Sequence, residues 1–151
     1  MRISAETHVA LAPGEAFEAL AALPPMEHLA RHRALEVARL DDTPPIAAGA
    51  RWRLAFTLAG RRHAVDVRLA RVARPELLLF ESRGEAVAAT TRLTLAAAEG
   101  GARLGVLLTP EPRGLAGRVV MQAARLSRER IEAGLAARLD AYARRLEAHG
   151  G

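Results

Sequence analysis

The sequence predicts an α+β fold: a seven-stranded antiparallel sheet covered by one long C-terminal helix, with two short helices between strands 1 and 2. Three observations lead to this fold class. Apolar and polar residues alternate along several short segments, which is the period of a half-buried strand. Turn-forming Gly, Pro and Asp residues separate those segments. Residues 115–148 contain no proline and repeat apolar residues at three- and four-residue steps, which is typical of a helix lying on a core.

The N-terminal part predicts one strand followed by two short helices. Residues 1–12 alternate with a period of two, so they are expected to form a half-buried strand. Pro13 then breaks the strand and begins a helix that turns Phe17 inward. Pro24 ends this helix, and a second short helical piece is expected over residues 26–33.

The middle of the chain predicts six strands joined by turns. They are expected over residues 35–38, 51–59, 65–70, 77–82, 87–96 and 102–109. Strands that follow one another through hairpins form an antiparallel sheet. Only the C-terminal helix is long and apolar enough to cover one face of that sheet.

The predicted C-terminal helix carries one apolar stripe. At about 100° per residue, the stripe comprises Val120, Met121, Ala124, Ile131, Leu135, Leu139, Tyr142 and Leu146. A single helix over residues 115–148 would be about 50 Å long. The first half of the stripe is built from small residues and leaves room beside the sheet, whereas the half after Ile131 is expected to fill the core.

Composition restricts the classes of function. The 151 residues fit one domain, expected to span residues 1–151. The absence of cysteine excludes disulfides and thiolate chemistry. No apolar run approaches the about 20 residues of a membrane span, and no signal-peptide segment begins the chain, so we expect a cytoplasmic protein. All 22 basic residues are arginines scattered among 17 acidic ones, and no nucleic-acid partner is expected because no basic cluster with aromatic residues forms.

Four segments carry a resemblance to a known superfamily. They are residues 11–20 (LAPGEAFEAL), residues 49–52 (GARW), residues 75–80 (PELLLF) and the terminal helix. In this order they resemble the SRPBCC superfamily of START, polyketide-cyclase and pollen-allergen-like proteins, over essentially the whole chain. The resemblance implies a helix-grip fold, in which a curved sheet wraps around the C-terminal helix and encloses an apolar cavity for a lipid, polyketide or similar molecule.

The leading functional prediction is non-enzymatic binding or transport of a small hydrophobic ligand in a cavity between the sheet and the C-terminal helix, without a cofactor. Inward-facing strand positions and the first half of the helix are the candidate cavity lining. These candidates are Trp52, Leu54, Phe56, Val67, Leu79, Thr91, Leu93, Val106, Val120, Met121, Ala124 and Arg128. The alternative for the same residues is an ordinary filled core.

Arg128 is the charged member of that set. By helical phase it falls within the apolar stripe, where a guanidinium needs a partner. The partner is a ligand carboxylate or phosphate held by two hydrogen bonds, or an internal carboxylate such as Glu81 or Asp66. The alternative is a side chain that extends to solvent at the mouth of the cavity.

A second hypothesis is an enzyme of the cyclase or dehydratase type with its polar groups in the same cavity. The candidate groups are Arg128, His63, Asp66 and Tyr142. This hypothesis requires at least two of them to converge within hydrogen-bond reach. His28 and His32 have a spacing that suits zinc, but no third ligand is near them in sequence, so no metal site is expected.

A third hypothesis is a protein-interaction module or a homodimer. Leu115, Val119 and Leu126 lie off the apolar stripe of the predicted helix. Together they could form an exposed apolar patch for a partner or for a second copy of the chain.

Overall fold

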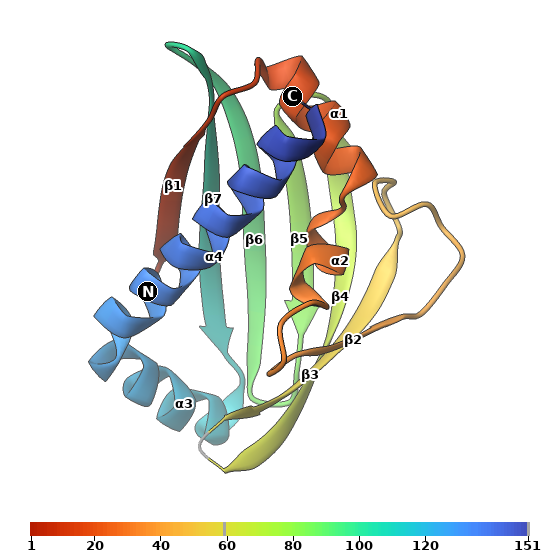
Figure 1. Ribbon diagram of the computed structural model, residues 1–151. Coiled ribbons are helices and arrows are strands. Elements are labelled where there is room, and N and C mark those ends of the chain that lie inside the picture. Colours follow the sequence, from red (N-terminus) through yellow and green to blue (C-terminus); the bar gives the residue numbers. More distant parts are fainter. Residues whose placement is uncertain (59, 151) are drawn as a thin grey trace.

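The computed structural model describes residues 1–58 and 60–150, without the side chain of Leu58. In chain order the elements are β1 (Ile3–Val9), α1 (Pro13–Ala22), α2 (Pro25–Leu29), β2 (Glu36–Arg39), β3 (Arg51–Leu58), β4 (Arg61–Ala73), β5 (Leu77–Arg83), β6 (Val87–Ala98), β7 (Gly101–Pro112), α3 (Gly114–Leu126) and α4 (Arg128–Gly150) (Figure 1). The predicted order of strands and helices is confirmed. Ala59, predicted as the end of a strand, lies outside the described residues.

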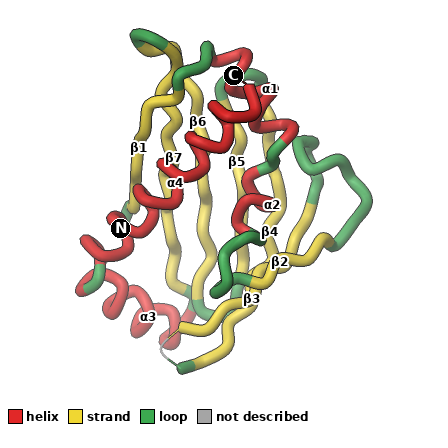
Figure 2. The backbone as a smooth tube through the Cα atoms, in the orientation of Figure 1, coloured by secondary structure: helices red, strands yellow, loops and turns green. Residues whose placement is uncertain are grey.

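The strands form one antiparallel sheet in the order β1-β7-β6-β5-β4-β3-β2. Neighbours in sequence are therefore neighbours in the sheet, except that β1 pairs with β7 instead of β2. The two short helices α1 and α2 make this crossover, and the helices lie over one face of the sheet (Figure 2). The predicted fold class, a seven-stranded antiparallel sheet with a long C-terminal helix, is confirmed.

Strand register separates an apolar face from a charged face. Trp52 of β3 pairs with Val67 of β4, and both belong to the buried core together with Phe80 of β5. One residue along, Arg68 of β4 pairs with Glu81 of β5, and their side chains form an ion pair at 2.5 Å. The side that carries Trp52 is called the inner face below, and the side that carries Arg68 is called the outer face.

The core lies between the inner face, α1 and the C-terminal half of α4. Its least exposed large side chains are Val9, Leu20, Trp52, Leu69, Leu78, Leu104 and Leu146. Helix α4 packs against β1 and α1. The hydroxyl of Tyr142 on α4 donates a hydrogen bond of 2.7 Å to the carbonyl oxygen of Leu23, which follows α1. This bond ties the long helix to the crossover.

The helix predicted over residues 115–148 is present as two helices. Helix α3 ends at Leu126, and Ser127 leaves helical geometry with φ −106° and ψ 14° before α4 begins at Arg128. The expectation of one continuous helix of about 50 Å is therefore wrong. Helices α3 and α4 form a corner at this point (Figure 1), so each packs on a different part of the sheet.

The start of α3 is held by the turn between β5 and β6. The backbone N–H of Arg113 donates to the carbonyl oxygen of Ala86 at 2.7 Å, and its guanidinium donates to the carbonyl oxygen of Gly84. Gly117, one turn into α3, comes so close that an added Cβ would lie 2.1 Å from the Ala86 oxygen. A residue without a side chain is thus required for this helix to reach the β5–β6 turn.

Candidate ligand-binding site

The inner face consists of a closed half and an open half. In the closed half, beneath α1 and the end of α4, Leu69, Leu78 and Leu104 are no more than 1% exposed. The open half lies toward α3, where large apolar side chains on the same face remain partly exposed. Its strand residues are Leu54 and Phe56 of β3, Val65 of β4, Thr91 of β6 and Leu108 of β7. These apolar side chains face the helices but remain in contact with solvent, so they are candidates for binding a hydrophobic ligand.

Helix α3 supplies the small residues beside this open half. Met121 is buried, whereas Val120 and Ala124 are partly exposed. The side chains at 117, 120 and 124 are short, and whether they leave a space beside the sheet stays a prediction. The lining is mainly apolar, and its polar strand side chains include Thr91, His63 and Ser82. The Ser82 hydroxyl donates to the carbonyl oxygen of Ala89 at 3.4 Å.

His63 lies on the inner face near the beginning of β4. Its ring stacks on the ring of Phe56, with 5.6 Å between centroids and 19° between planes. The two residues are also direct cross-strand partners in the β3–β4 register. Stacking places the imidazole at the edge of the open half, where its nitrogens can offer a hydrogen bond to a ligand.

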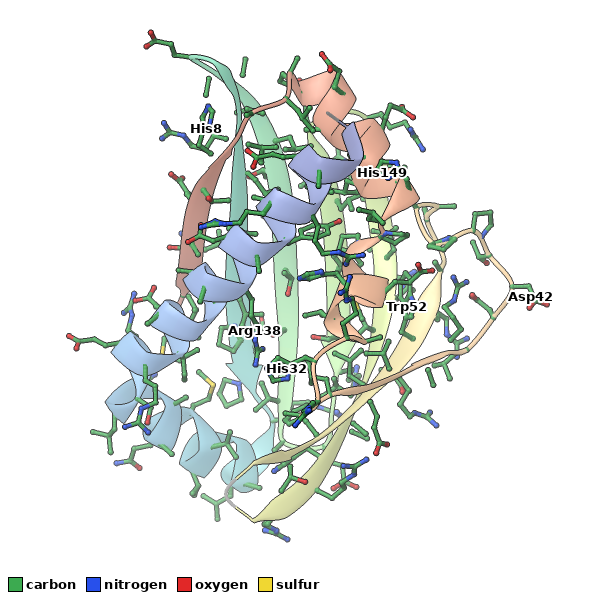
Figure 3. All side chains as sticks on the ribbon, in the orientation of Figure 1. His8, His32, Asp42, Trp52, Arg138 and His149 are labelled. Atoms are coloured by element: carbon green, nitrogen blue, oxygen red, sulfur yellow. The ribbon has the colours of Figure 1, made fainter. Side chains whose placement is uncertain are left out.

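Two arginine–histidine contacts join α4 to the α2 region. A guanidinium nitrogen of Arg145 lies 2.8 Å from Nδ1 of His28, and one of Arg138 lies 3.2 Å from Nε2 of His32. Figure 3 shows Arg138 and His32 pointing toward one another between α4 and the segment after α2. Because these segments are far apart in sequence, spacing alone could not have revealed these contacts.

His28 is held in its neutral form. Arginine only donates hydrogen bonds, so Nδ1 of His28 is the acceptor for Arg145. Burial, followed by the charges of Arg145 and Arg31, lowers the pKa of His28 below its ordinary value. The ring also lies against Tyr142, with 4.8 Å between centroids.

His32 meets a donor at each ring nitrogen. The Ala34 N–H lies 3.1 Å from Nδ1, and Arg138 lies near Nε2. Since a neutral imidazole has one acceptor nitrogen, only one of these contacts is a hydrogen bond. Within the described residues no group of three or more metal-ligating side chains occurs.

The four polar side chains of the enzyme hypothesis do not converge. Asp66 lies on the outer face in an ion pair with Arg53 at 2.8 Å. Tyr142 is buried against Leu23, and burial raises its pKa. Of the four, His63 is the one placed at the open half.

Arg128 was predicted within the apolar stripe, and this placement is wrong. Its side chain is 51% exposed, and its Nε lies 3.4 Å from Glu132 on the next turn of α4. The break at Ser127 ends one helix and begins another, so helical phase counted from α3 does not carry into α4. Its partner is accordingly neither Glu81 nor Asp66.

Leu79 was also predicted to line the cavity, and the strand register contradicts this. It pairs with Arg71 of β4 and Arg92 of β6 on the outer face, while its neighbours Leu78 and Phe80 point into the core. The uninterrupted apolar run over residues 77–80 concealed which positions alternate inward.

The remaining predicted lining residues lie on the inner side of the fold. Trp52, Val67, Leu93 and Met121 are buried. Those that stay partly exposed are Leu54, Phe56, Thr91, Val106, Val120 and Ala124.

A hollow of about 420 Å³ lies on the outer face of the sheet, away from the open half. Its charged lining consists of Arg51, Asp66, Arg68, Glu81, Arg83 and Glu111. Three arginines and three carboxylates balance in charge, and cross-strand ion pairs hold two of the carboxylates. This polar surface does not suit a hydrophobic ligand.

Comparison with known proteins identifies the fold. No protein-family model and no curated protein sequence matches this chain. Among solved structures, TTHA0849 from Thermus thermophilus is 14% identical over 98% of both chains, with a TM-score of 0.68. The di-domain ARO/CYC StfQ from the steffimycin biosynthetic pathway is 14% identical with a TM-score of 0.69, over 99% of this chain and 50% of that chain.

A third structure, Ara h 8.0201, is 15% identical over 95% of this chain and 97% of its own, with a TM-score of 0.62. Similarity at such low identity is a similarity of fold. It agrees with the sheet order, the β1–β7 pairing and the helices over one face. The chain therefore has the helix-grip fold.

Proposed function

We propose that this protein binds a small hydrophobic ligand against the open half of the inner face, without transforming it. The observation that carries the proposal is the contrast within one face of the sheet. Leu69, Leu78 and Leu104 are packed away from solvent, whereas Phe56 and Leu108 on the same face are not. Covering such apolar area gains about 25 cal/mol for each Å² removed from water.

The lining indicates the character of the ligand. Aliphatic and aromatic side chains from β3, β4 and β7 face the small residues of α3. Thr91, His63 and Ser82 are polar side chains that the strands add, so a mainly apolar molecule with a few hydrogen-bonding groups fits best. The similarity in fold to an ARO/CYC protein supports a ligand of this kind.

Binding is favoured over catalysis by the placement of the polar groups. A cyclase or dehydratase needs acid and base groups positioned together around the ligand. Asp66 and Arg128 are engaged in ion pairs away from the inner face, and Tyr142 donates to a backbone carbonyl. Of the four candidate groups, only His63 lies at the open half, which supports a carrier rather than an enzyme.

A matched pair of tryptophan substitutions on α3 tests the proposal. Ala124→Trp fills the open half, because Ala124 lies on the inner side of the helix, whereas Ala123→Trp places the same side chain in solvent. Titration with the uncharged fluorescent probe N-phenyl-1-naphthylamine should show saturable binding to the wild type and to Ala123→Trp. Affinity should fall by at least about tenfold in Ala124→Trp, equivalent to about 1.4 kcal/mol.

Thermal unfolding of both variants checks that each is folded. Equal probe affinity in the two variants, or no saturable binding to the wild type, contradicts the proposed site. Mass spectrometry of organic extracts from the purified protein then identifies a co-purifying ligand.

A further inference from the structure

The outward side of α3 is apolar and exposed. Leu115, Val119 and Leu126 are 78%, 63% and 89% exposed. At about 100° per residue they fall within about 40° of one another around the helix axis, so they form one stripe. Gly117 and Met121 are buried on the opposite side. Helix α3 thus presents apolar residues both to the fold and to solvent.

Two arginines border this outward stripe on one side. Arg118 and Arg125 are exposed, and by helical phase both lie on the same side of the stripe. From residue 112 to residue 128 the chain contains no Asp or Glu. Within the described residues neither arginine forms an ion pair. The surface therefore combines protruding apolar side chains with uncompensated positive charge.

We propose that α3 docks on an anionic lipid membrane surface. In this arrangement Leu115, Val119 and Leu126 enter the interface between headgroups and acyl chains, and Arg118 and Arg125 contact lipid phosphates. A cationic helix with exposed leucine and valine is the form that binds the plane of a bilayer without crossing it. No helix of the described residues has the length and apolarity of a membrane span.

Charge favours a membrane over a second copy of the chain. An antiparallel symmetric dimer through this stripe would bring Arg118 and Arg125, which lie on one side of it, toward their counterparts, and α3 has no carboxylate to pair with them in any arrangement. Anionic lipids supply the opposite charge. The corner position of α3 leaves its outward side clear of α4 and the sheet (Figure 1).

Docking would also place the open half beside the bilayer. Val120 and Ala124, on the inner side of the same helix, border that half. A hydrophobic molecule would then pass between the membrane and the protein with little exposure to water. The docking proposal rests on α3 alone and does not require that the open half binds a ligand.

Vesicle sedimentation with the full chain tests the docking. The wild type should bind vesicles of phosphatidylcholine with 30% phosphatidylglycerol and bind pure phosphatidylcholine vesicles weakly. At 0.5 M NaCl its binding to the anionic vesicles should fall to the level seen with pure phosphatidylcholine, because salt screens the arginines. The double variant Val119→Ser, Leu126→Ser should lose at least about tenfold in affinity for the anionic vesicles, because apolar insertion is removed.

Two charge variants separate local from overall electrostatics. Arg118→Gln with Arg125→Gln should weaken binding by about 30-fold, since each arginine near an anionic surface contributes about a factor of five. Arg71→Gln with Arg92→Gln lowers the net charge equally, but both positions lie on the outer face of the sheet. That control should bind vesicles within about twofold of the wild type.

Equal weakening by both charge pairs, or no preference for anionic vesicles, overturns the proposal. A third result would also overturn it. The wild type would fail to bind vesicles, and light scattering would show a dimer that the substitution Leu126→Arg dissociates. Ala124→Trp separates this proposal from the ligand site, because it should reduce probe binding and leave vesicle binding intact.

Discussion

Gly117 provides a sharp test of how the C-terminal helices sit on the sheet. In Gly117→Ala the new Cβ would lie 2.1 Å from the carbonyl oxygen of Ala86 and 3.0 Å from two backbone atoms of Pro112. All three contacts are with backbone, so no side chain can rotate away. Overpacking of this kind costs up to about 3 kcal/mol, while alanine gains about 1 kcal/mol over glycine in a helix.

The net destabilisation expected for Gly117→Ala is about 2 kcal/mol. For a chain of this length that lowers Tm by about 4–8 °C, because each kcal/mol corresponds to about 2–4 °C. Gly134→Ala is the matched control, since nothing lies within 4 Å of a Cβ built at this position of α4. It should raise Tm by about 2–4 °C through helix propensity alone.

Calorimetry of the wild type and both variants measures the two effects. If α3 separates from the β5–β6 turn without global unfolding, amides 117–126 should exchange with solvent faster while Tm changes little. A Gly117→Ala protein that matches the wild type in both Tm and exchange would refute the close approach of α3 to Ala86.

Two further predictions concern the contacts between α4 and the α1–α2 region. Tyr142→Phe removes the donor to the Leu23 carbonyl oxygen and should lower the free energy of unfolding in urea by about 1–3 kcal/mol; an unchanged midpoint would contradict the bond. Burial and the positive charges of Arg145 and Arg31 lower the pKa of His28 in the folded state. As pH falls through about 6.5, the unfolded chain therefore binds more protons than the folded chain, and the free energy of unfolding should decrease. The slope of unfolding free energy between pH 8 and 5 should be smaller in His28→Asn, and parallel curves for the two proteins would exclude this contribution.

The strands were predictable because burial of one face imposes a period of two. Trp52, Leu54 and Phe56 alternate with arginines and small residues, and all three lie on the inner face. Where alternation ends, the prediction fails. Leu77, Leu78, Leu79 and Phe80 are all apolar, so only pairing with β4 and β6 decides that Leu79 faces outward.

The helix break at Ser127 had no comparable signal. Serine is common at helix ends but is also tolerated inside helices, and the apolar period continues across it. The direction of α3 depends on Arg113 and Gly117 meeting the β5–β6 turn, more than 25 residues away in sequence. The mistaken placement of Arg128 follows from that undetected break.

The sequence by itself determined the order of elements, the antiparallel sheet, the helix that covers it and the apolar character of the inner face. Each of these follows from local period and turn chemistry, which are properties of neighbouring residues. The tertiary structure alone decided which half of the inner face stays open, where the long helix divides and which histidines meet Arg138 and Arg145. These features depend on contacts between segments that are distant in sequence. A shift of a few ångströms between such segments decides whether apolar side chains form a packed core or an open surface.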